Sequence, residues 1–298
     1  MYNLLHSDRE GISPLKPAPF RYVRAETLDE AIAALAEHGD EAKVLAGGQS
    51  LVPLMNLRLA FPSVLVDLNG LGELDGVSVN GSVEIGAMSR QVAVERSVGS
   101  AAPLVAEALR HVGHPAIRSR GTFGGTVAHA DPAAEIPAVL LALGGEIVAR
   151  GPGGKRVIPA DELFVTHFTT ALAADEVLTR VRIPRAGAGL RWGFAEVARR
   201  QGDFALAGVA ATAEVDEDGV CRSARIALFG VADRPVRALA AEQAIAGRRL
   251  DDAGALHDAE GLAAEGLTPR NDVHASSRYR KDVVGVLVRR ALQQAAAR

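Results

Sequence analysis

The sequence predicts an α+β chain that folds as two or three compact units. With 298 residues and 48% hydrophobic composition, the chain can bury about three quarters of the surface that its unfolded form exposes, enough for two cores. A strand, a glycine turn and a helix follow one another early in the chain, whereas from Val77 onward alternating runs and hairpin turns indicate antiparallel sheet.

Composition and charge narrow the classes of function. The net charge is −3, from 33 basic and 36 acidic residues, so we expect no nucleic-acid partner. The single cysteine, Cys221, excludes an internal disulfide and an iron–sulfur cluster built from this chain's cysteines alone, and suits a reducing cytoplasm. Because no apolar run approaches about 18 residues and no secretory signal is present, we expect no membrane span and a cytoplasmic location.

The first unit is predicted to follow an N-terminal extension (residues 1–15). A capping box formed by Thr27 and Glu30 predicts a helix that Gly39 ends. A strand over 43–46, a turn at 47–48, a helix over 50–59 and a strand over 64–67 then form a βαβ unit. Its helical crossover predicts parallel pairing of the two strands.

The second unit begins with a hairpin at Asn80 and Gly81. Ser89 is predicted to cap a short helix, and residues 103–111 form another. Asp131 before Pro132 predicts an N-cap and a helix over 132–143. A hairpin over 146–159 and a strand over 177–183 complete the unit.

A glycine- and alanine-rich stretch at residues 186–189 is the predicted domain boundary, close to residue 190. Beyond it we expect strands over 192–199, 205–215 and 221–229, followed by three helices. The last helix, over 277–297, is expected to bury Leu287 and Ala291 and to leave Arg280 in solvent.

Two glycine turns carry the main functional hypothesis. Gly47 and Gly48 open one turn, and the run over residues 121–132 contains the other. Where a glycine turn leads into a helix, backbone N–H groups lie bare and face an anion, commonly a phosphate. Two such turns can hold one diphosphate between them, which predicts a nucleotide-sized ligand.

The sequence gives less support to nucleophilic catalysis, to standard nucleotide-binding motifs and to a metal site. Ser50 lacks the final glycine of a nucleophile elbow, and no phosphate-binding loop or dinucleotide-binding glycine fingerprint is present. His111, His114 and His129 match no compact metal-ligand spacing. Asp131 is either a helix cap or an acid–base residue, whereas Glu135 is placed to accept hydrogen bonds from ligand hydroxyls.

Four segments show a family resemblance. Residues 46–60, 117–138, 175–184 and 198–210 together resemble the FAD-binding medium subunit of the aerobic carbon monoxide dehydrogenase and xanthine dehydrogenase family of molybdenum hydroxylases. The resemblance implies a two-subdomain FAD-binding domain of the vanillyl-alcohol oxidase type over 16–185, divided near residue 70. It also implies a small C-terminal α+β domain over 190–298, with a three-stranded antiparallel sheet and helices.

The same resemblance implies the function and its residues. The chain is expected to bind FAD and to pass electrons within an oxidoreductase complex. A large molybdenum-cofactor subunit and a small iron–sulfur subunit are its implied partners, in a dimer of heterotrimers that reduces an external acceptor. The implied FAD contacts, none of them catalytic or metal-binding, are Val44, Leu45, Ala46, Gly47, Gly48, Gln49, Ser50, Leu51, Thr122, Phe123, Gly124, Gly125, Thr126, Asp131, Glu135 and Leu178.

Two alternatives stay open from the sequence. A stand-alone flavin oxidase of the vanillyl-alcohol type needs its own substrate pocket, and no tyrosine or histidine stands among the implied FAD contacts at residues 44–51 and 122–126 for covalent flavin attachment. A flavin-free scaffold subunit is the other alternative, and the intact glycines argue against it.

Overall fold

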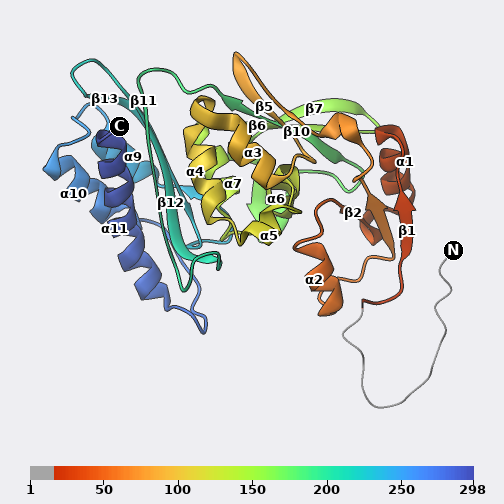
Figure 1. Ribbon diagram of the computed structural model, residues 1–298. Helices are drawn as coiled ribbons and strands as arrows, with labels where there is room; N and C mark the ends of the chain where they lie inside the picture. Colours follow the sequence, from red (N-terminus) through yellow and green to blue (C-terminus); the bar gives the residue numbers. More distant parts are fainter. Residues whose placement is uncertain (1–16) are drawn as a thin grey trace.

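The computed structural model describes residues 17–298, which form three parts in chain order (Figure 1). The expected extension at residues 1–15 lies outside the described residues. Among those described, no helix has the length and apolar character needed to cross a membrane.

The first part is a three-stranded parallel sheet with helices between its strands. Its strand order is β1-β3-β2, so the predicted parallel pairing of the βαβ unit is confirmed, and the sequence prediction missed β1. The helix after the glycine turn ends earlier than predicted, and Arg58 beyond it adopts a left-handed backbone (φ 56°). The elements are β1 (Arg21–Arg24), α1 (Leu28–His38), β2 (Ala42–Leu45), α2 (Leu51–Asn56) and β3 (Val64–Asp67).

The second part is a five-stranded antiparallel sheet, in the order β4-β5-β10-β6-β7, with helices packed beside it. Its strands are β4 (Val77–Asn80), β5 (Ser82–Gly86), β6 (Glu146–Gly151), β7 (Gly154–Pro159) and β10 (Val177–Pro184), with a separate ribbon of β8 (Phe164–Thr166) and β9 (Thr169–Thr170). Its helices are α3 (Gln91–Val98), α4 (Pro103–His111), α5 (Pro115–Arg118), α6 (Phe123–His129), α7 (Glu135–Leu143) and α8 (Ala160–Leu163).

Two predicted helix starts in this part are wrong. The Ser89 hydroxyl bonds the backbone of Gly76 instead of capping α3. Asp131 accepts a hydrogen bond from the N–H of Ala133, so it closes a turn, and α7 begins only at Glu135. In both cases a side chain that suits a helix cap satisfies a nearby turn instead.

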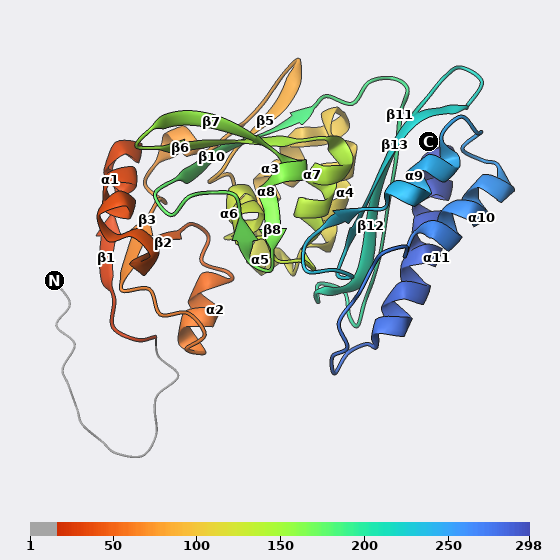
Figure 2. The same cartoon turned by 180° about the vertical axis from the view of Figure 1, so that it is seen from behind.

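The third part contains an antiparallel sheet in the order β11-β12-β13-β14, covered on its outer face by α11 (Figure 2). The three predicted strands are confirmed, and a short fourth strand extends them. Arg280 was expected in solvent but is 5% exposed, because its guanidinium donates to the carbonyl of Gly230 and pairs with Asp272. The elements are β11 (Leu190–Ala198), β12 (Ala205–Val215), β13 (Cys221–Phe229), β14 (Val236–Arg237), α9 (Leu239–Ile245), α10 (Ala253–Leu262) and α11 (Ser277–Ala296).

Helix α7 joins the second and third parts. It packs against β12 and β13 on the face opposite α11 (Figure 1). At its C-terminal end, the carbonyls of Leu141 and Ala142 accept hydrogen bonds from Arg225 (2.7 Å) and Thr212 (2.6 Å). These bonds satisfy carbonyls that a helix end leaves without intrahelical partners. The third part therefore fixes the position of the helix whose first residue is Glu135.

Candidate functional site

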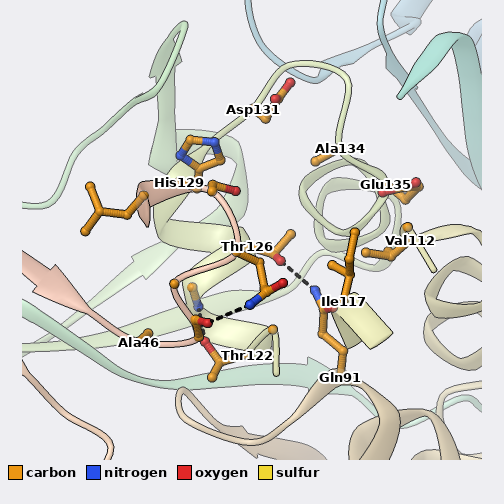
Figure 3. Close-up of a pocket in the computed structure, with 18 of the residues that line it drawn as sticks. Ala46, Gln91, Val112, Ile117, Thr122, Thr126, His129, Asp131, Ala134 and Glu135 are labelled. Carbon is orange, nitrogen blue, oxygen red and sulfur yellow. Dashed lines mark hydrogen bonds between the residues drawn. The ribbon is translucent and has the colours of Figure 1, made fainter. Parts of the chain in front are cut away.

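The two glycine turns lie side by side and line one cavity of about 280 Å³ (Figure 3). A β-carbon added at Gly47 in the first turn would collide with the carbonyl oxygen of Arg120, just before the second turn. A β-carbon added at Gly125 would lie 3.6 Å from that of Ala46. The predicted convergence of the turns is therefore seen, and it depends on the missing side chain at Gly47.

Two polar side chains outside the cavity hold the turns together. Asn69 follows β3 and donates to the carbonyl of Ala46 at 2.9 Å. Arg90 donates to the Asn69 side-chain oxygen at 2.7 Å and also to the carbonyl of Arg120. One chain of hydrogen bonds thus runs from the first turn to the second, and the sequence analysis did not identify either residue.

The first turn presents free hydrogen-bond donors. Within the part of the chain that the structure describes, the backbone N–H groups of Gly48, Gln49 and Ser50 donate to no other protein group. Gly48 has a φ of 71°, a conformation that glycine adopts at little cost. This turn can therefore bind an anion as the sequence analysis predicts.

The second turn differs from its prediction. The N–H groups of Phe123 and Gly124 donate to the carbonyls of Ser89 and Ala87, and that of Gly125 donates to the Thr122 hydroxyl. They are not free to bind a phosphate. This turn contributes the Thr126 side chain instead, whose hydroxyl accepts a 2.7 Å hydrogen bond from Gln91 at the start of α3 (Figure 3). The buried Oε1 of Gln91 has no partner among the described residues.

Glu135 is the most perturbed acid of the cavity wall. It lies in the first turn of α7 and is 6% exposed. Burial raises its pKa to about 8, and the nearby charge of Glu196 acts in the same direction. At neutral pH its carboxyl is therefore mostly protonated and can donate a hydrogen bond as well as accept one.

The third part of the chain closes one side of the cavity. Gly202, Asp203 and Phe204, which precede β12, line it together with the two turns. The same residues, with Ile117 and Asp131, also line an adjoining cavity of about 700 Å³ that contains Arg199, Arg270 and Arg280 in its wall. The smaller cavity therefore borders a larger one with several basic side chains.

Twelve of the sixteen predicted contact residues line the cavity. These are Val44, Ala46, Gly47, Gly48, Gln49, Ser50, Leu51, Thr122, Gly125, Thr126, Asp131 and Glu135. Leu45, Phe123, Gly124 and Leu178 do not; Phe123 and Leu178 pack in the hydrophobic core. The sequence analysis missed Gln91, Val112, Gly113, Ile117, Gly121, His129, Ala134, Gly202, Asp203 and Phe204, of which the last three lie in a segment that carried the family resemblance but no assigned role.

Among the described residues, no three His, Cys, Asp or Glu side chains are grouped to hold a metal ion. His129 lines the cavity, and burial lowers its pKa. Cys221 is buried at the start of β13, where burial raises the pKa of its thiol to about 11.

Comparison with known protein families divides the chain in two: one match covers the first and second parts of the structure, and the other covers the third part. Residues 18–186 match the model "FAD binding domain in molybdopterin dehydrogenase", and residues 192–295 match "CO dehydrogenase flavoprotein C-terminal domain". The two matches together span almost all of the described residues.

Individual relatives are similar in sequence to this chain over nearly their full lengths. The chain is 39% identical to the 6-hydroxypseudooxynicotine dehydrogenase complex subunit alpha of Paenarthrobacter nicotinovorans, covering 94% of this chain and 96% of that protein. It is 36% identical to the carbon monoxide dehydrogenase medium chain of Hydrogenophaga pseudoflava, covering 95% of this chain and 99% of that protein.

Solved structures agree with the fold. A chain of carbon monoxide dehydrogenase from Hydrogenophaga pseudoflava superposes with a TM-score of 0.91 at 37% identity, covering 94% of this chain and 98% of the other. A chain of quinoline 2-oxidoreductase from Pseudomonas putida 86 superposes with a TM-score of 0.88 at 38% identity, covering 95% of this chain and 98% of the other. The chain therefore belongs to the FAD-binding medium subunits of the carbon monoxide dehydrogenase and xanthine dehydrogenase family of molybdenum hydroxylases.

Proposed function

We propose that this chain binds one FAD non-covalently in the cavity between the two glycine turns and acts as the electron-transfer subunit of its complex. As a family member, it is an oxidoreductase subunit. The observation that carries the proposal is the single cavity lined by both turns and by residues 202–204. The flavin, when bound, supplies the capacity to accept electrons from iron–sulfur clusters of a partner and to release them to an external acceptor.

The residues present suit this cofactor. The free N–H groups of Gly48, Gln49 and Ser50 would bind the diphosphate. Gln91 lines the cavity, and its side-chain amide orients the Thr126 hydroxyl through a 2.7 Å hydrogen bond. We propose direct contact for the twelve predicted residues that line the cavity. The other four predicted contacts are proposed to lie near the flavin, behind the residues that line the cavity: Leu45, Phe123, Gly124 and Leu178.

The assembly is proposed from the family. The partners are a large molybdenum-cofactor subunit and a small iron–sulfur subunit, in a dimer of heterotrimers in the cytoplasm. We propose a FAD-binding domain over 16–185, divided near residue 70, and a C-terminal domain over 190–298. The cavity of about 700 Å³ beside Phe204 offers the external acceptor a way to approach the flavin.

An absorbance spectrum of the purified chain tests FAD binding. We expect flavin bands at about one FAD per chain. Gly47→Ala should lower FAD affinity at least about tenfold, because its β-carbon collides with the Arg120 carbonyl. Gly153→Ala is the matched control, since a β-carbon there meets no atom within 4 Å. Unchanged FAD binding by Gly47→Ala would overturn the proposed position of the cofactor.

Co-purification separates the remaining alternatives. Molybdenum and iron that purify with the native complex support the electron-transfer subunit, whereas substrate oxidation by the flavin-loaded chain alone would support a stand-alone oxidase. A native complex without flavin would support the scaffold. The relatives do not favour either alternative.

A further inference from the structure

A buried carboxylate stands at the end of β3, behind the first glycine turn. Asp67, the last residue of this strand, is 8% exposed and does not line the cavity. Its Oδ2 accepts a hydrogen bond from the hydroxyl of Tyr22 on β1, and its Oδ1 accepts from the backbone N–H (2.8 Å) and the side-chain amide (2.6 Å) of Asn69. Burial opposes ionisation of Asp67, but these hydrogen bonds outweigh burial and lower its pKa, so the group is a carboxylate at neutral pH.

This carboxylate decides which way the Asn69 amide faces. A side-chain amide carries an accepting oxygen and a donating NH₂ group, whereas a carboxylate can only accept. Asp67 therefore admits the one orientation in which Asn69 turns its Nδ2 toward the carboxylate. In that orientation Nδ2 also donates to the carbonyl of Ala46 at 2.9 Å, and the amide oxygen accepts from Arg90 at 2.7 Å. The reversed amide would set its oxygen against two acceptors and its NH₂ group against a guanidinium.

The position of the Ala46 carbonyl fixes the N–H of Gly47. No peptide bond in the described part of the chain is cis, so the carbonyl and the N–H of the Ala46–Gly47 peptide point in opposite directions. Asn69 holds the carbonyl on one side, and on the other side the Gly47 N–H donates to no group of the described residues. The Gly47 carbonyl is held in turn by the side-chain amide of Gln49 at 3.1 Å, which orients the N–H of Gly48 by the same rule. Successive N–H groups arranged in this way form an anion-binding concavity.

We propose that Asp67 is a positioning residue for FAD: through Asn69 it fixes the Ala46–Gly47 peptide so that the Gly47 N–H faces the diphosphate. The inference rests on the proposed FAD site, and it adds one donor to the free N–H groups of the first turn. Asp67 acts without touching the ligand. In Asp67→Asn the side chain can donate as well as accept, so both orientations of the Asn69 amide become possible and the peptide is no longer held in one position.

The FAD affinity of Asp67→Asn tests this inference. For the full chain, the dissociation constant measured by flavin fluorescence should rise by about tenfold, because one hydrogen bond to a charged phosphate is misaligned. Tyr22→Phe is the matched control: it removes a hydrogen bond from the other oxygen of the same carboxylate and leaves both bonds to Asn69. Its dissociation constant should stay within about twofold of wild type. Equal losses in the two variants would overturn the role of Asp67.

A double-mutant cycle separates positioning from a purely structural role. Asn69→Ala should weaken FAD binding at least as much as Asp67→Asn does. In the Asn69→Ala background, Asp67→Asn should then change the dissociation constant by less than about twofold, because both side chains act on the same peptide. A contribution of Asp67 to the sheet alone would persist in that background, so two losses that multiply in full would overturn the inference.

Phosphorus NMR of the FAD-saturated chain keeps the inference testable where Asp67→Asn does not fold. Asn69 is exposed, so Asn69→Ala removes no part of the core. One FAD phosphate resonance should shift in Asn69→Ala and stay in place in Tyr22→Phe, and unshifted resonances in Asn69→Ala would overturn the inference. Failure of the wild-type chain to bind FAD would overturn the proposed function itself, whereas wild-type affinity of Asp67→Asn would overturn this inference alone.

Discussion

Asn69 and Arg90 do not line the cavity, yet they connect its two halves. The Asn69 amide holds the carbonyl of Ala46, and the Arg90 guanidinium holds both the Asn69 oxygen and the carbonyl of Arg120. A guanidinium suits this task because its donors form a rigid planar fork. The precision of the site therefore depends on two residues that lie outside the cavity, and Asp67 orients one of them by accepting a 2.6 Å hydrogen bond from the Asn69 amide.

Replacing Arg90 should weaken FAD binding without removing any contact to the ligand. We expect Arg90→Met to lower FAD affinity by about tenfold, because the first turn loses its tie to the second. Titration with FAD measures the effect. Arg96→Met, at an exposed position in α3, the helix that Arg90 precedes, is the matched control. Equal affinity of the two variants would show that the tie is dispensable.

At the scale of elements, α7 links the FAD-binding part to the C-terminal sheet. Its last carbonyls accept from Thr212 and Arg225, and the carbonyl of Pro132 before it accepts from the N–H of Gly230 at 2.8 Å. Both ends of the helix are therefore held by the C-terminal sheet and the turn that follows β13. This arrangement fixes Glu135 relative to the C-terminal sheet.

Removing the Thr212 hydroxyl should destabilise this link. Thr212→Val keeps the shape of the side chain but leaves the buried carbonyl of Ala142 without a partner, which costs about 1–3 kcal/mol in the free energy of unfolding. Urea denaturation measures the change. Thr169→Val, at an exposed position on β9, should change stability by less than about 0.5 kcal/mol. A loss no larger than that of the control would contradict the importance of the bond.

The sequence predicted most elements, and its errors have a common cause. Hairpin turns and runs of β-forming residues correctly located β6, β7 and β10 to β13, even though β12 is buried on both faces over residues 207–213. The starts of α3 and α7 were wrong because Ser89 and Asp131 bond to turns that only the tertiary structure creates. β1 was missed because its four residues are largely exposed and show no alternation.

At the scale of the whole molecule, three parts of the chain meet at one cavity. The βαβ unit contributes the first turn, the second part contributes Glu135 and Gln91, and the C-terminal domain contributes Phe204. A ligand bound there contacts all three parts at once. The free energy of ligand binding therefore stabilises the association of the three parts.

Calorimetry tests this expectation. FAD at about 100 times its dissociation constant should stabilise the chain by about 2.7 kcal/mol. The melting temperature of a chain of 298 residues should then rise by roughly 4 °C. Because all three parts line the cavity, every unfolding transition of the chain should move. A shift confined to one transition, with another unchanged, would contradict the shared site.

Only those parts of the site that a local sequence pattern marks could be predicted from the sequence. Glycines mark the turns, so their meeting at one cavity could be predicted from Gly47 and Gly125. The N–H partners of Phe123 and Gly124 could not, because they come from the loop after β5. Gln91 and residues 202–204 carry no local signature of ligand binding, and only the packing of separate elements brings them to the cavity.

The burial of Cys221 has a practical consequence. It is the only cysteine in the sequence, and its thiol is both enclosed and hard to ionise. Maleimide reagents should therefore leave the native chain unmodified. A single cysteine introduced on an exposed loop would then accept a fluorophore or spin label at one defined position, and distances from that label to a bound flavin could be measured without first removing the natural thiol.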